Sequence, residues 1–435
     1  MAMNRAIWGA RRGLLAPRRS SPAAVYRRAA AANYSTSSPS PPSSSSPASQ
    51  RVPSKTSAPA FAFAFDIDGV LLHVAEPIPG AKESLRFLHD NNIPFILLTN
   101  GGGKREADRV GFLAERLGVP LSTDNFVQSH TPFRQLVDGG EDGGLRDKTI
   151  LVTGSDYERC RAIAREYGFR NVVTPADLLA AEPTLFPFRS LAELQQGATP
   201  LPKPLYDGSK SSLELESSLK IDAMFVFDDP RDWAVDIQII MDLLLSHRGY
   251  LGTLSPKNGD ASLPGCGWQQ DGQPPLYFSN GDLVWAAKYH LPRFGQGAFQ
   301  AAVAGVWDRY TGGHPLRRTV IGKPAGETYR FAERVLTSHR HETLRRMGLH
   351  EPPALRSVYM VGDNPESDIA GANGHVSEAG TQWVSVLVKT GVWNEERDRG
   401  VLVGRKKPGV IVDDVREAVK WALWRERWEG LWKGE

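Results

Sequence analysis

Hydrophobic residues in this chain form short apolar runs that alternate with longer stretches of helical periodicity. The run Phe61–Phe65 reads Phe-Ala-Phe-Ala-Phe, and residues 94–98 form a second apolar run. Runs of this length predict strands that are buried on both faces of a parallel sheet. Residues 81–88 and 105–117 carry apolar side chains at helical spacing. This alternation of strand and helix predicts a doubly wound, Rossmann-like α/β sheet.

The same rhythm restarts near residue 132 and predicts a second α/β domain that is inserted into the first. Its expected strands and helices are residues 149–152, 157–167, 223–227, 233–247 and 276–279. Two stretches rich in Pro, Gly and polar residues, 174–218 and 255–275, are expected to be long loops. The first sheet is expected to resume after residue 290, with strands at 358–361 and 384–388.

We therefore predict five segments along the chain. They are an N-terminal extension at residues 1–58, a first core part at 59–131, an inserted cap at 132–290, a second core part at 291–424 and a tail at 425–435. A chain of 435 residues is long enough for two such domains with full cores. The sequence has no apolar run of 18 or more residues, which argues against a membrane-spanning helix.

The first 60 residues differ in composition from the rest. They contain nine Lys or Arg residues and no acid, and the first 35 are rich in Arg, Ala and Ser. This composition is typical of a mitochondrial presequence and predicts a mitochondrial protein of the matrix. A disordered basic tail is the alternative. Residues 35–59 are rich in Ser and Pro and are expected to be a disordered linker.

Without this segment the net charge changes sign. Removing nine basic residues from 52 leaves 43 against 49 acidic residues, a net charge of −6, whereas the whole chain carries +3. A nucleic-acid partner is therefore not indicated. The two cysteines, Cys160 and Cys266, form no Cys-x-x-Cys pair and predict neither a disulfide framework nor a zinc site.

The chain ends in an amphipathic stretch in which Trp421, Trp424, Trp428 and Trp432 recur every three or four residues. In one helix this spacing places all four side chains on one face. Two interpretations remain open: the face packs on the core, or part of it binds a partner or a membrane surface. A homodimer through this helix or through the cap is also compatible with the sequence.

Two carboxylates follow the first apolar run. Asp66 and Asp68 stand at the end of the predicted strand, and Gly69 follows them. Asp66 is suited to attack phosphorus as a nucleophile, and Asp68 is suited to protonate the leaving oxygen and then to activate water. Asp-x-Asp-Gly also occurs in calcium loops, but the buried apolar strand before it argues against that interpretation.

A hydroxyl side chain ends the second predicted strand. Thr99 precedes Asn100 and Gly101, which stand at the expected start of a helix. A hydroxyl and backbone N–H groups at a helix start suit the binding of phosphate oxygens. The alternative role for Thr99 is a simple helix cap.

Three further charged residues come from later in the chain. Lys323, in a Gly-Lys-Pro sequence, is suited to neutralise negative charge on Asp66 and on a transferred phosphoryl group. Asp363 follows a third apolar strand and is predicted to bind Mg²⁺ together with Asp66 and the backbone carbonyl of Asp68. Asp368 either caps the next helix or holds Lys323 and a metal-bound water, and both roles stay open.

With these motifs in this order, the chain resembles the haloacid dehalogenase (HAD) superfamily of phosphohydrolases from Phe61 to about Leu423. The residues that carry the resemblance, in motif order, are Asp66 with Asp68, then Thr99, then Lys323, then Asp363 with Asp368. An inserted α/β cap between the second and third motifs is similar to class IIA, the group of NagD and the pyridoxal phosphate phosphatases. The resemblance implies a Rossmann-like HAD core with a class IIA cap.

Other segments refine this resemblance. Residues 277–282, Tyr-Phe-Ser-Asn-Gly-Asp, resemble the segment where such a cap returns to the core, and residues 294–298 resemble the glycine segment that follows it. The triple glycine at residues 101–103 and the enlarged cap are similar to the mitochondrial "cat eye syndrome critical region protein 5-like" group, which is loosely associated with glycerophospholipid metabolism. NagD-like enzymes carry a second Asn and a Ser or Thr in place of these glycines, so a side-chain contact to substrate is expected to be lost.

The resemblance implies a Mg²⁺-dependent phosphatase that forms an aspartyl-phosphate. A cap over the site would exclude bulky substrates and favour a small phosphorylated metabolite. One alternative is a non-catalytic binding or scaffold protein that keeps the fold, for which the tryptophan-bearing helix is the main support. Another is a phospholipid-linked transferase, but the membrane-spanning segments and second paired-aspartate motif that it would need are not found in the sequence.

Overall fold

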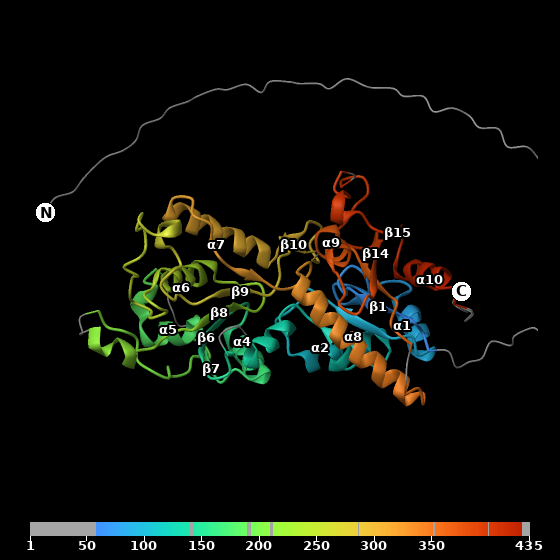
Figure 1. Ribbon diagram of the computed structural model, residues 1–435, viewed down its shortest axis with the longest axis horizontal. Coiled ribbons are helices and arrows are strands. Elements are labelled where there is room, and N and C mark those ends of the chain that lie inside the picture. The colour runs from blue at the N-terminus through green and yellow to red at the C-terminus, as the bar shows by residue number, and fades with distance from the viewer. Residues whose placement is uncertain are drawn as a thin grey trace, which may run out of the picture. The chain divides into compact units, whose positions relative to one another are not determined.

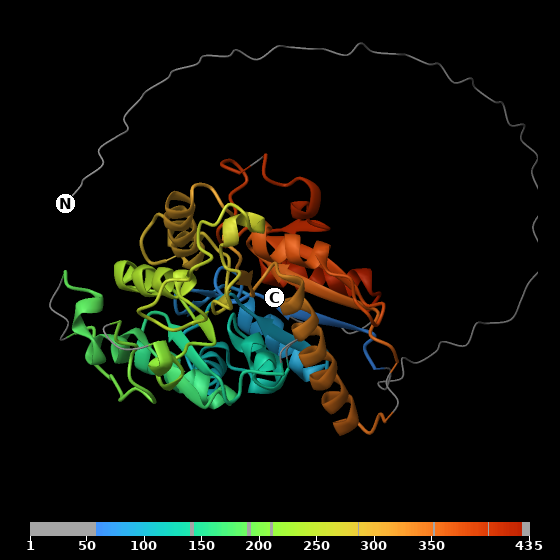
Figure 2. The same ribbon diagram turned by 60° about the vertical axis from the view of Figure 1, so that its left-hand side comes forward.

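The computed structural model describes residues 58–139, 143–188, 193–208, 212–285, 287–350, 353–398 and 400–428. The predicted presequence, nearly all of the predicted linker, and Trp432 lie outside these residues. Figures 1 and 2 show two sheets, each with helices on both of its faces.

Six parallel strands form the first sheet, which is the core of the fold. Their order is β15 (Val410–Val412), β14 (Gln382–Val388), β13 (Ser357–Gly362), β1 (Phe61–Phe65), β4 (Phe95–Leu98) and β5 (Phe126–Val127). Every neighbouring pair in this order is parallel. The predicted doubly wound α/β core is therefore confirmed, and β1 lies between β13 and β4 at its centre.

The side chains of β1 divide the helices of the core into two layers. These helices are α1 (Ala81–Asp90), α2 (Glu106–Leu117), α8 (Gly326–Arg346), α9 (Ala370–Gly374) and α10 (Val415–Arg425). The three phenylalanines of β1 pack in one cluster with α1, α2 and α10. Ala62 and Ala64 pack on the opposite face with α8 and α9. All five side chains are buried, as expected for a strand covered on both faces.

A second sheet of five parallel strands forms the cap. Its order is β12 (Thr319–Val320), β9 (Leu276–Phe278), β8 (Ala223–Val226), β6 (Thr149–Thr153) and β7 (Asn171–Val173). The helix α4 (Tyr157–Tyr167) covers one face. The helices α5 (Pro175–Ala181), α6 (Trp233–Leu245) and α7 (Gln296–Thr311) cover the other.

The domain boundary that we predicted at residue 290 is wrong for two elements. We expected α7 and β12 in the second core part. Instead, Phe299, Val303 and Trp307 of α7 belong to the hydrophobic cluster of the cap sheet, and β12 pairs with β9 of that sheet. Strand pairing is non-local, so chain order did not show that β12 extends the cap. The chain returns to the core only at the loop that carries Lys323.

The stretch at residues 174–218 is not one long loop. It begins with α5, whose start is fixed by a capping box in which Thr174 and Asp177 exchange side-chain and backbone hydrogen bonds. Arg161 of α4 contacts Asp177 at 2.9 Å, and both side chains are buried. This buried ion pair ties α5 to α4. The Thr-Pro-Ala-Asp sequence carried the capping signal, and we misinterpreted it as loop composition.

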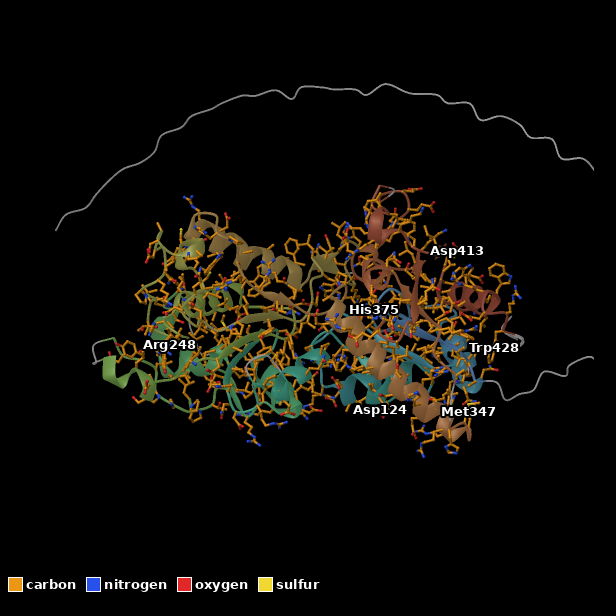
Figure 3. The ribbon with its side chains drawn as sticks, in the orientation of Figure 1. Asp124, Arg248, Met347, His375, Asp413 and Trp428 are labelled. Atoms are coloured by element: carbon orange, nitrogen blue, oxygen red, sulfur yellow. The ribbon has the colours of Figure 1, made fainter. Side chains whose placement is uncertain are left out.

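The three C-terminal tryptophans that the structure describes do not share one helical face. Helix α10 ends at Arg425, and Arg427 has a positive φ of 53°, so Trp428 follows a turn rather than the helix. Trp428 packs edge-on against Phe61, with ring centroids 5.6 Å apart, beside the core (Figure 3). Trp421 packs edge-on against Tyr359. Trp424 is 76% exposed. The core-packing interpretation therefore holds for Trp421 and Trp428.

The remaining elements are short. β2 (Leu72–His73) pairs with β3 (Glu76–Pro77), β10 (Val284–Trp285) pairs with β11 (Arg293–Phe294), and α3 spans Gln135–Asp138. The sequence analysis predicted neither of these two hairpins. In the described part of the chain, no helix is both long and apolar enough to cross a membrane.

Candidate active site

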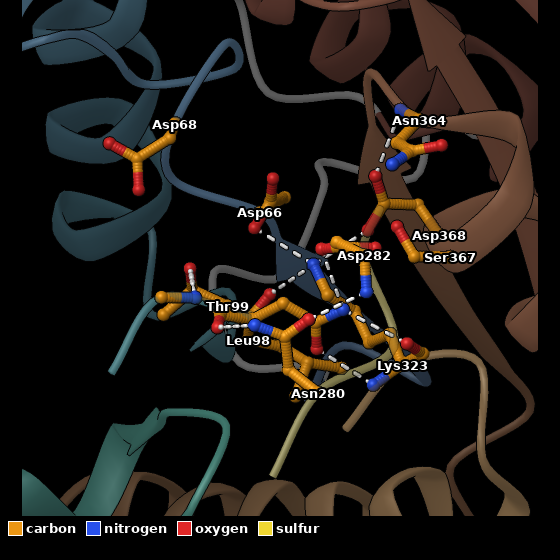
Figure 4. A network of polar contacts seen from close by, with 12 residues as sticks. Asp66, Asp68, Leu98, Thr99, Asn280, Asp282, Lys323, Asn364, Ser367 and Asp368 are labelled. Atoms are coloured by element: carbon orange, nitrogen blue, oxygen red, sulfur yellow. Dashed lines mark hydrogen bonds and ion pairs between the residues drawn. The ribbon is translucent and has the colours of Figure 1, made fainter. Parts of the chain in front are cut away.

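The predicted motif residues meet at the carboxyl edge of the core sheet. Asp66, Thr99 and Asp363 each follow the last residue of one of three adjacent strands, β1, β4 and β13. Lys323 reaches the same point from the loop after β12 (Figure 4). Ligands of open parallel sheets bind at this edge, so the fold places these side chains where chemistry is expected.

Lys323 holds two of the carboxylates together. Its Nζ donates hydrogen bonds to Asp66 Oδ1 at 2.8 Å, to Asp368 Oδ1 at 2.6 Å and to the carbonyl oxygen of Leu98 at 2.9 Å. Only 1% of the lysine is exposed. Burial alone would lower the pKa of Lys323, but the carboxylates of Asp368 and Asp66 outweigh that effect and raise it. The lysine is therefore a fixed positive charge at the site.

The structure also shows what Asp368 contacts. Its Oδ1 accepts the hydrogen bond from Lys323, and its Oδ2 accepts one from the backbone N–H of Asn364 at 3.0 Å. The N-cap of helix α9 is Ile369, so Asp368 does not cap that helix. Of the two roles left open, holding Lys323 is the one that the contacts show. Asn364 accepts a hydrogen bond from the backbone N–H of Glu366 and so caps the short helical segment Pro365–Ile369 that precedes α9.

Asp68 lies apart from this network (Figure 4). Its nearest cation is Arg109, whose guanidinium nitrogen lies 3.7 Å from Asp68 Oδ2. The Asp68 side chain is 41% exposed and lines a cavity between core and cap. Burial of the surrounding site raises the pKa of Asp68 to about 6, while Arg109 opposes this shift and Asp66 adds to it. A carboxyl with a raised pKa suits the acid in a pair of carboxyl groups with different roles.

Gly69 lets the chain turn after these aspartates. It has a φ of 91°, and a Cβ atom there would lie 2.5 Å from Asp363 Oδ2. Glycine is the residue that takes this conformation without strain, and its missing side chain lets Asp363 approach.

The local structure after Thr99 differs from our expectation. Helix α2 begins at Glu106, so Asn100 and Gly101 are not at a helix start. The hydroxyl of Thr99 accepts a hydrogen bond from the N–H of Gly101 at 2.9 Å, and thus stabilises a turn rather than capping a helix. Asn100 braces the lysine loop: its Oδ1 accepts from the N–H of Lys323 at 2.8 Å, and its Nδ2 donates to the carbonyl of Lys323 at 2.9 Å.

The carboxylates form a group that fits a divalent cation. Asp66, Asp363 and Asp368 are buried, and each offers an oxygen within 4.8 Å of the others. Lys323 is the one basic side chain in ion-pair contact with this group among the described residues. Burial, Asp66 and Asp368 raise the pKa of Asp363 well above its ordinary value. A bound cation would relieve this crowding of negative charge, and carboxylate oxygens are the ligands that hard divalent cations prefer.

A cavity of about 720 Å³ opens above these groups, and its walls come from both core and cap. The sequence analysis missed several residues that line it. The carboxylate of Asp282 accepts a hydrogen bond from Asn100 Nδ2 at 2.9 Å, and burial raises its pKa to about 6. Asp228 and Asp229 line the cavity from the loop after β8. These residues are far apart in sequence, and only the segment at 277–282, which resembled the return of the cap, pointed toward one of them.

The triple glycine, in the loop after β4, is the place where the cap approaches the core. Gly103 has a φ of 75°, and a Cβ atom there would collide with the carboxylate of Asp228. A Cβ atom on Gly102 would lie 2.6 Å from Ser129 Oγ and 3.3 Å from the carbonyl oxygen of Phe227. The glycines therefore allow close contact between core and cap, a role that the sequence comparison with NagD-like enzymes did not suggest.

Fold and site together define a hydrolase of the haloacid dehalogenase type. Family models described as haloacid dehalogenase-like hydrolase and HAD-hydrolase-like match residues 63–170 and 320–418. The chain belongs to this family of enzymes. It is 39% identical over 378 residues to the mitochondrial hydrolase YKR070W of Saccharomyces cerevisiae, a match that covers 84% of this chain and 96% of the yeast protein.

A second relative is a fusion protein of Schizosaccharomyces pombe named cardiolipin synthase (CMP-forming) / mitochondrial hydrolase. It is 38% identical over 374 residues, which cover 85% of this chain and 54% of the fusion protein. The chain thus spans about half the length of that relative.

Solved structures share the fold at low sequence identity. The p-nitrophenyl phosphatase of Archaeoglobus fulgidus is 16% identical with a TM-score of 0.51, over 84% of this chain and 99% of the archaeal one. A hypothetical protein of Pyrococcus horikoshii is 20% identical with a TM-score of 0.50, over 83% and 99% of the two chains. These similarities support the core-and-cap fold.

Proposed function

We propose that this chain is a Mg²⁺-dependent phosphatase that cleaves a small phosphate monoester through an aspartyl-phosphate on Asp66. The observation that carries the proposal is the difference in surroundings between two carboxylates. Asp66 is fixed by Lys323 at 2.8 Å, while Asp68 lies apart with a raised pKa and faces the same cavity. The similarity to proteins named hydrolases, and in fold to one named a phosphatase, supports it.

In the first step a carboxylate oxygen of Asp66 forms a bond to phosphorus as the bond from phosphorus to the leaving oxygen breaks. Asp68, protonated, gives its proton to that leaving oxygen, so an alcohol departs. The positive charge of Lys323 stabilises the negative charge that builds up between Asp66 and the phosphoryl group.

In the second step a water molecule attacks phosphorus and the bond from phosphorus to Asp66 breaks. Asp68, now ionised, accepts a proton from this water. Inorganic phosphate leaves, Asp66 is again a carboxylate, and Asp68 is again protonated. Each aspartate therefore returns to its starting state, and the net reaction consumes one water.

We propose that four groups hold Mg²⁺ or its water shell: Asp66, Asp363, Asp368 and the backbone carbonyl of Asp68. When bound, Mg²⁺ supplies positive charge that shields phosphate oxygens from the carboxylates of the site. We keep the prediction that Thr99, Asn100 and Gly101 lie beside the phosphate of the substrate. Asn100 acts by positioning Lys323, whose backbone it binds.

The cap limits the size of the substrate. Cap residues that include Ser155, Asp228 and Trp285 wall the same cavity as Asp66, and its volume suits a small molecule rather than a folded phosphoprotein. The basic N-terminal segment and the names of the relatives support a mitochondrial location, and we propose the matrix. A homodimer remains a prediction.

The scaffold alternative has lost its main support. It rested on a face of four tryptophans, but Trp421 and Trp428 pack against aromatic side chains of the core. The ion pair between Lys323 and the proposed nucleophile Asp66 supports a catalytic role instead.

Phosphate release by the purified protein from a panel of phosphorylated metabolites, with and without Mg²⁺, tests the proposal. We expect Asp66→Asn to abolish Mg²⁺-dependent release. Asp108→Asn is the matched control, because Asp108 is exposed on α2 and does not line the cavity. Equal turnover by wild type and Asp66→Asn would overturn the proposed nucleophile.

A further inference from the structure

Exposed apolar side chains are concentrated in one short segment. Of the fifteen exposed large apolar side chains in the described part of the chain, five lie within residues 283–285 and 287–294, which we name the rim hairpin. Their exposures are Leu283 58%, Trp285 43%, Tyr289 54%, Leu291 52% and Phe294 70%. Single exposed apolar residues are ordinary, but a cluster of this kind marks an interaction surface.

The rim hairpin is also basic. Its described residues include Lys288 and Arg293, both exposed, and no acid. The guanidinium of Arg293 lies over the ring of Tyr289, 4.6 Å from its centroid. The backbone is fixed by the pairing of β10 with β11, in which Val284 faces Phe294 and Trp285 faces Arg293. The segment therefore presents aromatic, aliphatic and cationic side chains on a defined hairpin.

This hairpin forms part of the mouth of the cavity. Trp285, Lys288, Tyr289 and Arg293 line the cavity that contains Asp66, although Trp285 and Tyr289 are also about half exposed. Strands β10 and β11 contact α7 of the cap, and Figure 1 shows β10 between α7 and the core. A partner that covers this surface must leave the cavity open, or it blocks the site.

We propose that the rim hairpin docks on an anionic phospholipid layer. Tryptophan and tyrosine favour the boundary between water and lipid, where their rings are buried and their polar atoms stay hydrated. Basic residues beside them add electrostatic attraction to anionic headgroups. The described residues of the hairpin include no acid, so two copies meeting through it would bring like charges together, which favours an anionic lipid layer over a second copy of this chain.

Docking in this orientation turns the cavity mouth toward the lipid. Val74, Val284 and Tyr289 give the mouth apolar walls, while the carboxylates and Lys323 lie at the core end. On the basis of the proposed phosphatase activity, the substrate class is then a phosphate monoester carried by a lipid, with its phosphate in the site and its chain toward the layer.

The test is sedimentation of the full chain with vesicles of phosphatidylcholine alone or mixed with phosphatidylglycerol. The test variant is Leu291→Ser with Phe294→Ser, since neither residue lines the cavity. The control is Leu254→Ser with Val376→Ser, whose side chains are 69% and 85% exposed outside the hairpin. We expect binding to the anionic vesicles only, at least tenfold weaker in the test variant, unchanged in the control and weakened by added salt.

The same proteins are assayed on a soluble aryl phosphate and on phosphatidate in vesicles. We expect the test variant to keep aryl phosphate turnover and to lose phosphatidate turnover. The docking proposal would be overturned if the protein did not bind vesicles, or if both variants lost vesicle binding equally. It would also be overturned if the protein formed a dimer that the test variant breaks and bound no vesicles. Because sedimentation needs no turnover, a lack of hydrolysis would overturn the proposed activity without affecting the docking result.

Discussion

At the scale of single residues, the site depends on one lysine and the unequal surroundings of two aspartates. Lys323 contacts Asp66 and Asp368 directly, whereas Asp68 has Arg109 at 3.7 Å as its nearest cation. The sequence indicated the aspartates through their positions at or shortly after apolar strand ends and the lysine through its Gly-Lys-Pro sequence, but it gave no sign of Arg109. It could not indicate that Asn100 holds the lysine loop through two hydrogen bonds to the backbone of Lys323, a residue 223 positions away.

Asp68→Asn should separate the two chemical steps. Asparagine cannot give or take the proton, so we expect turnover of alkyl phosphates to fall by roughly 10²–10⁴-fold. An aryl phosphate has a leaving group that needs no proton, so its first step should continue and release about one equivalent of phenol in a burst. Rapid-mixing kinetics measure this burst. Steady turnover of the aryl phosphate at the wild-type rate would contradict the role of Asp68.

At the scale of elements, the core strands and helices were predictable because they alternate at strand and helix periodicity. β1 illustrates this, since its Phe-Ala alternation and full burial follow directly from a central position in a parallel sheet. The assignment of α7 and β12 to the cap was not predictable, because it depends on β12 pairing with β9. Asp282 was missed for the same reason: its partner Asn100 is 182 residues away.

The contact between the triple glycine and the cap can be tested by substituting alanine for Gly103 and, as a control, for Gly111. Gly103→Ala introduces a Cβ atom at a φ of 75° and against Asp228. We expect the strain to cost about 1 to 3 kcal/mol and the displaced cap to lower kcat/KM. Gly111→Ala is the control, since Gly111 lies within α2 with nothing within 4 Å of its would-be Cβ atom.

Gly111→Ala should stabilise the protein slightly, because alanine favours a helix by about 1 kcal/mol over glycine. Thermal unfolding and phosphate release would be measured for both variants. If the two variants have the same unfolding temperature and the same rate of phosphate release, the predicted close contact between Gly103 and the cap is wrong.

At the scale of the whole molecule, core and cap are two sheets with separate hydrophobic clusters that share one cavity. Stability of the cap therefore affects the site without any change in the catalytic residues. The cap interior contains a buried acid that the mechanism does not use. Asp236 of α6 accepts hydrogen bonds from the hydroxyls of Thr153 and Tyr157, and its second oxygen has no partner among the described residues.

Asp236 should make the cap less stable as pH rises. Burial raises its pKa from an ordinary 3.8 to about 7, although the two hydroxyl groups oppose this shift. The folded state therefore binds the proton more tightly than the unfolded state, and the free energy of unfolding should fall by up to about 1.4 kcal/mol per pH unit between these two pKa values. Denaturant unfolding as a function of pH measures this slope.

Asp236→Asn keeps an oxygen for the two hydroxyls but cannot ionise. We expect the fall in stability between pH 4 and 7 to become smaller in this variant. An unchanged slope would show that Asp236 is not the group responsible.

The most direct test of the central claim is to trap the phosphoryl group on the protein. Asp68→Asn, mixed with an aryl phosphate and Mg²⁺ and quenched in acid, should carry one phosphoryl group, and peptide mass spectrometry should locate it on Asp66. Turnover by the wild type with no phosphoryl group on the protein at any time, or a phosphoryl group on a residue other than Asp66, would contradict the account.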